Sequence, residues 1–150
     1  MRVYLDNCCY NRPYDDQAQI RISLESQAKL QIQEMITQGD LELVASFMLT
    51  YENSRNRSEE KRESIRTFIE DNARIVIDGS RTEEIRAMAR NIEKTGVKPA
   101  DAIHTACAIL AECDYFLTTD DRLLRYESED IKITNPIEFV RMLDTENNSE

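Results

Sequence analysis

The sequence contains no tryptophan, only three glycines and three prolines, and no long hydrophobic run. Because glycine and proline interrupt regular elements, their scarcity excludes a low-complexity or fibrous chain and favours an ordered, helix-rich one. The absence of an apolar run of about 20 residues excludes a membrane-spanning helix. The first residues, MRVYLDN, include neither an apolar core nor a small-residue cleavage site, so we expect no signal peptide and a cytoplasmic protein.

Cysteine is also sparse, with four residues at positions 8, 9, 107 and 113 and no CxxC spacing. This pattern excludes a disulfide-rich secreted scaffold and predicts reduced thiols. A zinc site built from Cys8, Cys9, Cys107 and the single histidine, His104, is an alternative, but the spacings do not match those of tetrahedral zinc sites.

Basic residues are outnumbered, with 19 Lys and Arg against 29 Asp and Glu and a formal net charge of -10. This balance argues against a broad electrostatic surface for nucleic acid, although it leaves room for a local one. An acidic total also fits a protein whose carboxylates surround metal ions or bind a basic partner. The positions of the acids therefore matter more than their number.

The chain of 150 residues, of which 41% are hydrophobic, is long enough for one compact core and too short for two. We predict one domain over residues 1–143 and a disordered polar tail over residues 144–150. Short apolar segments predict strands at residues 2–5, 41–46, 74–78, 115–118 and 131–134. Between most of them, apolar residues recur every three to four positions, which predicts helices.

Residues typical of helix ends and loops lie between the predicted strands, as this arrangement of strands and helices requires. The segment 6–17 is expected to be a loop, and a helix is expected to start at Asp15 and Asp16 and to end before Gly39. Further helices are expected after Ser46 and Ser58, and Pro99 suits the first turn of another. Strands that alternate with helices predict an α/β fold with a mostly parallel sheet, in which ligands bind outside the carboxyl ends of the strands.

Acidic side chains fall where such a sheet would gather them. Asp6 and Asp120 follow apolar strands, Glu52 lies on the helix after the second strand, and Asp101 lies in the first turn of an apolar helix. A cluster of carboxylates is costly unless cations neutralise it, and oxygen ligands suit Mg²⁺ or Mn²⁺. The expected chemistry is phosphodiester hydrolysis, in which one ion activates water and one stabilises the departing oxygen.

Each acid also has an ordinary structural interpretation. Asp6 could be a turn residue, Asp101 could compensate a helix dipole, and Asp120 could cap a helix, while Glu52 could lie on a solvated helix face. Position alone does not separate them from Asp78, which also follows an apolar strand. Asp121, beside Asp120, is expected to be a first-turn acid of a short helix and not a ligand.

Four motifs carry a family resemblance, namely VYLDN (3–7), SFMLTYEN (46–53), KPADAIHTACAI (98–109) and YFLTTDDRLL (115–124). In this order they resemble the acidic motifs of the PIN domain family, and the resemblance extends to about residue 143. It implies an α/β PIN-like three-layer sandwich with a mostly parallel five-stranded sheet. It also implies a Mg²⁺- or Mn²⁺-dependent ribonuclease, including the toxins of VapBC-type toxin–antitoxin pairs. An RNA substrate, an antitoxin partner and a homodimer follow from it as expectations.

Carried over position by position, the resemblance makes Asp6, Glu52, Asp101 and Asp120 the metal-binding and catalytic acids. Thr118 matches a threonine that supports the metal site through hydrogen bonds, and Asn7 fills the polar position after the first aspartate. Many toxin members have Thr or Ser at that position. Possible substrate contacts are Arg12, Arg55 and Arg57, with Lys61 and Arg62 more typical of a salt-bridged helix surface.

Three questions stay open at this level. His104 shares a helix face with Asp101 and is either a general base or, as its setting favours, a packed and hydrogen-bonded side chain. The fold could persist as a catalytically silent module that binds RNA or protein. A phosphatase or a flap nuclease would use the same metals, although the short chain offers no additional segment for gripping branched DNA.

Overall fold

Five parallel strands form the centre of the molecule in the computed structural model, which describes residues 1–148. Their order in the sheet is β3-β2-β1-β4-β5, and every neighbouring pair is parallel. The strands are β1 (Arg2–Leu5), β2 (Glu42–Ser46), β3 (Ala73–Ile77), β4 (Tyr115–Leu117) and β5 (Lys132–Thr134). All five expected strands are therefore present.

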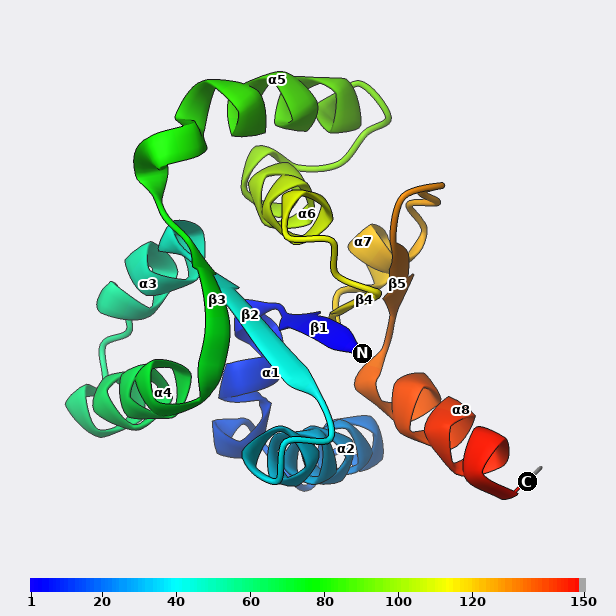
Figure 1. Ribbon diagram of the computed structural model, residues 1–150. Coiled ribbons are helices and arrows are strands. Elements are labelled where there is room, and N and C mark those ends of the chain that lie inside the picture. Colours follow the sequence, from blue (N-terminus) through cyan, green and yellow to red (C-terminus); the bar gives the residue numbers. More distant parts are fainter. Residues whose placement is uncertain (149–150) are drawn as a thin grey trace.

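Helices cover both sides of the sheet, with α5 and α6 on one side and α1, α2 and α8 on the other (Figure 1). This arrangement confirms the expected α/β sandwich. The helical elements are α1 (Asn7–Asn11), η1 (Arg12–Tyr14), α2 (Ile20–Thr37), α3 (Phe47–Ser54), α4 (Glu59–Asn72), η2 (Gly79–Arg81), α5 (Thr82–Glu93), α6 (Pro99–Leu110), α7 (Asp121–Leu124) and α8 (Pro136–Asn148).

The central strand explains where a site can form. Val3, Tyr4 and Leu5 of β1 are completely buried, as expected of a strand that is covered on both faces. From β1 the chain adds β2 and β3 on one side, and β4 and β5 later add on the other. The strand order therefore reverses between β1 and β4, and a crevice outside their carboxyl ends is the usual ligand site in such sheets.

Local signals in the sequence account for most helix ends. The hydroxyls of Ser46 and Ser58 accept hydrogen bonds from the backbone N–H groups of Leu49 and Lys61, so both serines cap the helices that follow. Gly39 and Gly96 have positive φ angles of 86° and 101°, which a side chain would disfavour. These ends agree with the sequence-based expectations.

The segment after β1 differs from expectation, because residues 7–14 form α1 and η1 and not an irregular loop. The next helix begins at Ile20 and not at Asp15 or Asp16. The carboxylate of Asp16 instead accepts from the backbone N–H of Ala18, which closes a turn ahead of the helix. The competing turn chemistry of this acid therefore delays the helix by about one turn.

The C-terminal tail also differs. Residues 144–148, expected to be disordered, continue α8 to Asn148, while residues 149 and 150 lie outside the described part. Extending an existing helix costs far less than starting one, and the Thr145 hydroxyl donates to the Arg141 carbonyl within it. Polar residues are therefore compatible with this exposed last turn.

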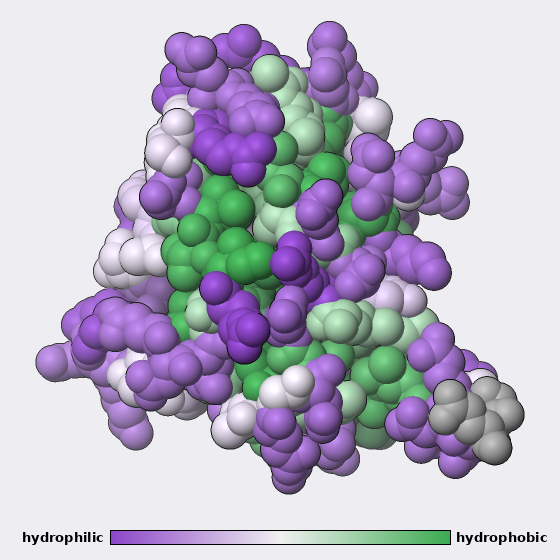
Figure 2. All heavy atoms as spheres, viewed as in Figure 1, coloured by the Kyte–Doolittle hydropathy of each residue, from purple (hydrophilic) through white to green (hydrophobic). Residues whose placement is uncertain are grey.

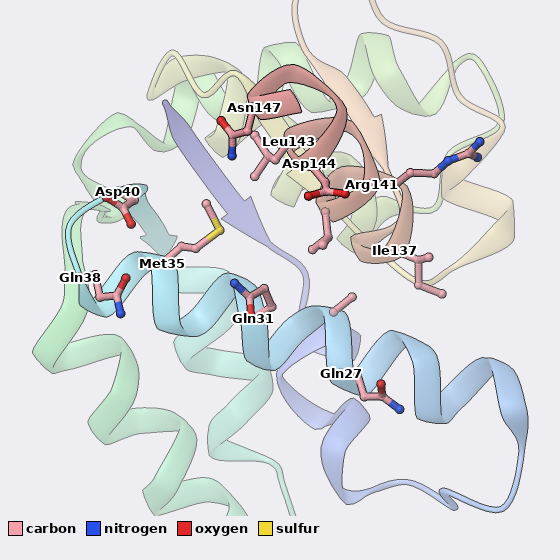
Figure 3. A pocket seen from close by; sticks show the side chains of 12 residues that line it. Gln27, Gln31, Met35, Gln38, Asp40, Ile137, Arg141, Leu143, Asp144 and Asn147 are labelled. Atoms are coloured by element: carbon pink, nitrogen blue, oxygen red, sulfur yellow. The ribbon is translucent and has the colours of Figure 1, made fainter. Parts of the chain in front are cut away.

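Hydrophilic side chains surround the rim of the face shown in Figure 2, and hydrophobic ones show in two areas, one around α6 and one between α2 and α8, with hydrophilic ones between them. Between α2 and α8 runs a groove of about 660 Å³, lined among others by Gln27, Gln31, Arg141 and Asp144 (Figure 3). None of the four predicted acids lines this groove. Within residues 1–148, no helix is both long enough and apolar enough to cross a membrane.

A buried carboxylate joins three parts of the chain. The side chain of Glu25 on α2 is 0% exposed and accepts from Arg12 Nε at 2.9 Å and from Arg21 Nε at 3.2 Å. The Asn135 side-chain amide, just before α8, also donates to it. Each oxygen of this buried charge is therefore paired, which offsets much of the cost of removing it from water.

We expect Glu25→Ala to lower the free energy of unfolding by about 2 kcal/mol, because Arg12, Arg21 and the Asn135 amide each lose a buried hydrogen-bond acceptor. Urea unfolding followed by circular dichroism measures the change. Glu34→Ala, which removes an exposed acid from the same helix, is the matched control and is expected to stay within about 0.5 kcal/mol of wild type. Equal losses in both variants would contradict the assigned role of Glu25.

Candidate metal centre

Asp6 occupies the carboxyl end of β1 and is held by several donors. It caps α1, where one carboxylate oxygen accepts from the Asn7 backbone N–H at 2.8 Å. The other oxygen accepts from the Thr118 hydroxyl at 2.8 Å. The Cys8 thiol lies 3.5 Å from the same oxygen. Asp6 is only 6% exposed, so these contacts orient a nearly buried carboxylate at the reversal point of the sheet.

Thr118 connects the ends of β1 and β4. Its hydroxyl donates to Asp6 and accepts from the backbone N–H of Asp120 at 3.1 Å, and the residue is completely buried. Asp120 in turn caps α7 by accepting from the Arg122 backbone N–H at 2.9 Å. The spacing of threonine and aspartate in the sequence thus ties one acid to the turn that carries another.

Glu52 approaches from α3, the helix that Ser46 caps directly after β2. Its side chain is 29% exposed and contacts the Nε2 atom of His104 on α6. Ligand atoms of Asp6, Glu52 and His104 all lie within 4.8 Å of one another. Three segments that are distant in sequence therefore meet at one point.

Asp101 completes the acidic group from the first turn of α6. Burial raises the pKa of its carboxyl to about 6, and the negative charges of Asp6 and Asp120 and, more weakly, Glu52 add to the effect. Mutual repulsion of this kind requires the carboxylates to share one site. The structure therefore brings the four predicted acids together, while their role as metal ligands remains a prediction.

The acid beside Asp120 has a different environment. Asp121 begins α7, as expected, and both of its carboxylate oxygens accept from Arg21 at 2.8 Å. These hydrogen bonds hold the pKa of Asp121 below its ordinary value. Arg21 also donates to the Thr119 carbonyl at 3.0 Å. Arg21 therefore donates hydrogen bonds to the residues on both sides of Asp120. The sequence pattern did not reveal this contact.

The side chains of most remaining predicted residues make contacts with residues other than the four acids. Asn7 accepts from the Asn11 amide through its side-chain oxygen at 3.2 Å. Arg12 is bound to Glu25 and Asp15, so its guanidinium belongs to the network around α2. Arg55 donates to the Tyr51 hydroxyl at 2.7 Å, and Arg57 is exposed between α3 and α4.

Sequence reasoning missed two cations near the acids. Lys98 and Arg122 are exposed and line the same small hollow as Asp101. Lys98 directly precedes α6 and Arg122 lies in the first turn of α7. Their positions beside Asp101 and Asp120 in the sequence were the available signal, since elements that start at one sheet edge place their first residues there.

The donor set fits a hard divalent cation better than zinc bound by thiols. Carboxylate oxygens dominate the cluster, and their repulsion is the property that a bound cation would relieve. Within residues 1–148 all four cysteines are free, as expected. The cluster of Asp6, Glu52 and His104 includes none of them. The alternative zinc site of Cys8, Cys9, Cys107 and His104 is therefore not the arrangement that the fold builds.

The burial of Asp101 and the repulsion from its neighbours predict an unusual change in stability. With chelator present, Asp101→Asn should raise the melting temperature at pH 7.5 by several degrees, because it removes a charge that the fold disfavours. The folded pKa of about 6 lies above the ordinary 3.8. The wild type therefore regains stability as the pH falls through 6, and the difference should close below about pH 4.

Asp121→Asn is the matched comparison, because the pKa of Asp121 is shifted in the opposite direction. A depressed pKa stabilises the fold above the ordinary value, so this variant should melt below wild type at pH 7.5 and converge with it in acid. Differential scanning calorimetry from pH 3.5 to 8 measures both variants. A lower melting temperature for Asp101→Asn at pH 7.5 would contradict the proposed repulsion.

The fold resembles that of solved VapBC2 and FitAcB structures at low sequence identity. The VapBC2 complex from Rickettsia felis, bound to a promoter DNA fragment, matches with a TM-score of 0.59 at 15% identity. The match covers 90% of this chain and 98% of that one. FitAcB from Neisseria gonorrhoeae matches with a TM-score of 0.53 at 17% identity, covering 89% and 97% of the two chains. At such identities, these matches establish the fold alone.

The sequence itself provides the family assignment. No curated protein sequence matches the chain significantly. The sequence model of the PIN domain, however, matches residues 40–129, which is more than half of the chain. The matched region includes Glu52, Asp101 and Asp120, whereas Asp6 precedes it. The chain belongs to the PIN domain family.

Proposed function

We propose that this protein is a Mg²⁺- or Mn²⁺-dependent endoribonuclease that hydrolyses RNA phosphodiester bonds and leaves a 5′-phosphate. The proposal rests chiefly on one observation, the convergence of four carboxylates from separate segments at the carboxyl edge of a parallel sheet. PIN domains are generally nucleases, which supports the same chemistry. A retired site has no physical need for a repulsive cluster of this kind.

Asp6, Glu52, Asp101 and Asp120 would hold the metal. When bound, a divalent cation lowers the pKa of its water and neutralises charge on the phosphate. The protein supplies positioning: Thr118 orients Asp6 and holds the Asp120 turn, and the Asn7 backbone fixes the second Asp6 oxygen. Hydrogen bonds to carboxylates at such a site keep the ligand oxygens in place before the cation arrives.

RNA binding requires local positive charge, because the chain as a whole carries a formal net charge of -10. Lys98 and Arg122 lie beside Asp101, so they can contact the phosphates that flank the cleaved bond. Arg57 is exposed, and Arg55 donates one hydrogen bond to Tyr51. Both can contact phosphates of nucleotides farther from the cleaved bond. Arg12 is a weaker candidate because Glu25 and Asp15 already occupy its guanidinium.

We further propose that the protein is the toxin of a type II toxin–antitoxin pair and that it forms a homodimer. Its fold matches solved chains of VapBC and FitAB complexes, one of them FitAB bound to an IR36 DNA fragment at a TM-score of 0.57 and 18% identity. The match covers 90% of this chain and 95% of that chain. An acidic protein suits a partner with a basic segment, because opposite charges favour association.

Asp6→Asn and Asp120→Asn should each lower Mn²⁺-dependent cleavage of RNA about a hundredfold or more, because each removes a charged ligand from the cluster. Gel analysis of a labelled RNA under single-turnover conditions measures the rate. Asp78→Asn is the control, since Asp78 also follows a strand but is exposed and caps η2. This variant should retain wild-type activity.

Two outcomes would contradict the nuclease assignment. One is full activity in both Asp6→Asn and Asp120→Asn with the fold intact by circular dichroism. The other is a wild-type protein that shows neither cleavage nor a rise in melting temperature at millimolar Mn²⁺. The second result would favour the alternative, a catalytically silent PIN-fold module that binds RNA or protein.

The two cations beside the acids give a separate prediction. The double variant Lys98→Ala/Arg122→Ala should raise KM for RNA with little change in kcat, because contacts to flanking phosphates bind the substrate and transition state alike. It should also reduce the slope of log affinity against log salt by about 1.4, the value for two lost phosphate contacts on a single strand. Fluorescence anisotropy with the Asp6→Asn background measures binding without cleavage.

Arg66→Ala/Arg141→Ala removes the same charge from α4 and α8 and is the control for the change in net charge. Arg66 is paired with Glu63 and Glu70 on the helix surface, and Arg141 lies beside the groove between α2 and α8. If both double variants weakened RNA binding equally, the effect would be one of total charge. A local contact role for Lys98 and Arg122 would then be wrong.

A further inference from the structure

A continuous chain of hydrogen bonds runs from the sheet to Glu52. The Ser46 and Tyr4 hydroxyls lie 2.6 Å apart, and the Tyr4 hydroxyl lies 2.6 Å from His104 Nδ1. His104 Nε2 then contacts the Glu52 carboxylate. Ser46 and Tyr4 are 0% exposed and His104 is 1% exposed. At this end of the chain, ligand atoms of His104 and Glu52 lie within 4.8 Å of one from Asp6.

The chemistry of the end group sets the direction of these bonds. An ionised carboxylate can only accept, so a neutral His104 must carry its proton on Nε2 and present Nδ1 as an acceptor. The Tyr4 hydroxyl lies 2.6 Å from Nδ1 and, as the O–H partner of that acceptor, donates its proton to it. Ser46 can then donate to the Tyr4 oxygen. Each donor in the chain has one acceptor.

The imidazole ring is also held by its neighbours. The Tyr4 ring lies 5.7 Å from it between centroids, and the Phe116 ring meets it nearly at right angles at 6.5 Å. Phe116 is completely buried on β4. A ring packed in this way cannot swing towards solvent or exchange its two nitrogens without moving the core.

We propose that His104 is a positioning residue that holds Glu52 in the acidic cluster, in the Nε2–H tautomer that its contacts with Glu52 and Tyr4 favour. The proposal deepens the proposed function and rests on it, because the value of orienting Glu52 depends on its role as a ligand. Groups that hydrogen-bond to ligating carboxylates commonly contribute ten- to hundredfold to metal affinity. His104 would act in this way through Glu52 and would not itself touch the metal.

Direct ligation by His104 is the opposing arrangement. It would require Nε2 without a proton, Nδ1–H donating to the Tyr4 oxygen, and loss of the contact with Glu52. A nitrogen ligand would also shift the preference of the site towards transition metals such as zinc. The two arrangements differ in the position of one proton and in the atoms bound to the metal, so spectroscopy separates them.

The first experiment uses metal-free wild-type protein. Two-dimensional ¹⁵N–¹H spectra of the single histidine report which ring nitrogen is protonated, and we expect the Nε2–H form at pH 7.5. Tyr4→Phe removes only the hydroxyl and should keep the Nε2–H form, because Glu52 still accepts from Nε2. A pure Nδ1–H form in the wild type would overturn the proposal, whether or not the protein is a nuclease.

The second experiment measures Mn²⁺ binding by the loss of the free-ion EPR signal. We expect His104→Leu to raise Kd about 10- to 100-fold. His104→Gln, whose side-chain amide can donate near the position of Nε2, should stay within about threefold of wild type. Ile85→Val is the stability control, because it trims the buried contact of α5 with α6 away from the acids. It should leave Kd unchanged.

Electron spin echo spectroscopy on the Mn²⁺-loaded wild type should show no nitrogen bound directly to the ion. A directly bound imidazole nitrogen, or equal Kd values for His104→Leu and wild type, would overturn the positioning role while leaving the metal site intact. A wild type that binds no Mn²⁺ would instead remove the proposed function, and the positioning role would fall with it. The failures of the two proposals are therefore distinguishable.

Discussion

Mutual repulsion between carboxylates is the constraint on which the arrangement of this protein depends. Like charges brought together at a partly buried sheet edge cost free energy, and the pKa of Asp101 is raised first by burial and further by the neighbouring carboxylates. The surrounding structure must supply enough packing and hydrogen bonding to hold them. Asp6 and Asp120 are anchored through Thr118, and the buried centre of the sheet lies directly behind them. Packing and hydrogen bonds in the rest of the fold thus offset the free-energy cost of the clustered carboxylates.

The scaffold meets this constraint with groups that are themselves fully paired. Arg21 illustrates the principle, because it binds Asp121, the Thr119 carbonyl and Glu25 at once and so connects α2 to the turn that carries Asp120. The chain from Ser46 to His104 does the same for Glu52 on the other side of the cluster. In both networks, residues that are distant in the sequence hold a segment that carries one of the four acids. Arg21 holds the turn of Asp120, and His104 contacts Glu52.

Much of the fold followed from the sequence, because its strands and helix ends have local causes. Ser46, Ser58 and Gly96 mark helix ends through their own side chains or backbone angles, and the structure agrees at each. The failures also have local causes: Asp16 closes a turn and delays a helix, and the polar tail continues α8. The four acids were found because strand ends converge in a parallel sheet. The contact of Arg21 with Asp121 and that of His104 with Tyr4 each join residues 100 positions apart, so periodicity carried no sign of them.

The strand order has a consequence for folding during synthesis of the chain. β4 is the fourth strand to leave the ribosome, yet it pairs with β1, the first, and it delivers Thr118 and the turn of Asp120 to Asp6. Contacts between such distant segments form late in folding, because closing a long loop is entropically costly. A nascent chain that has not yet released β4 therefore lacks a complete acidic cluster. The order of synthesis itself delays the appearance of the site until β4 has been released.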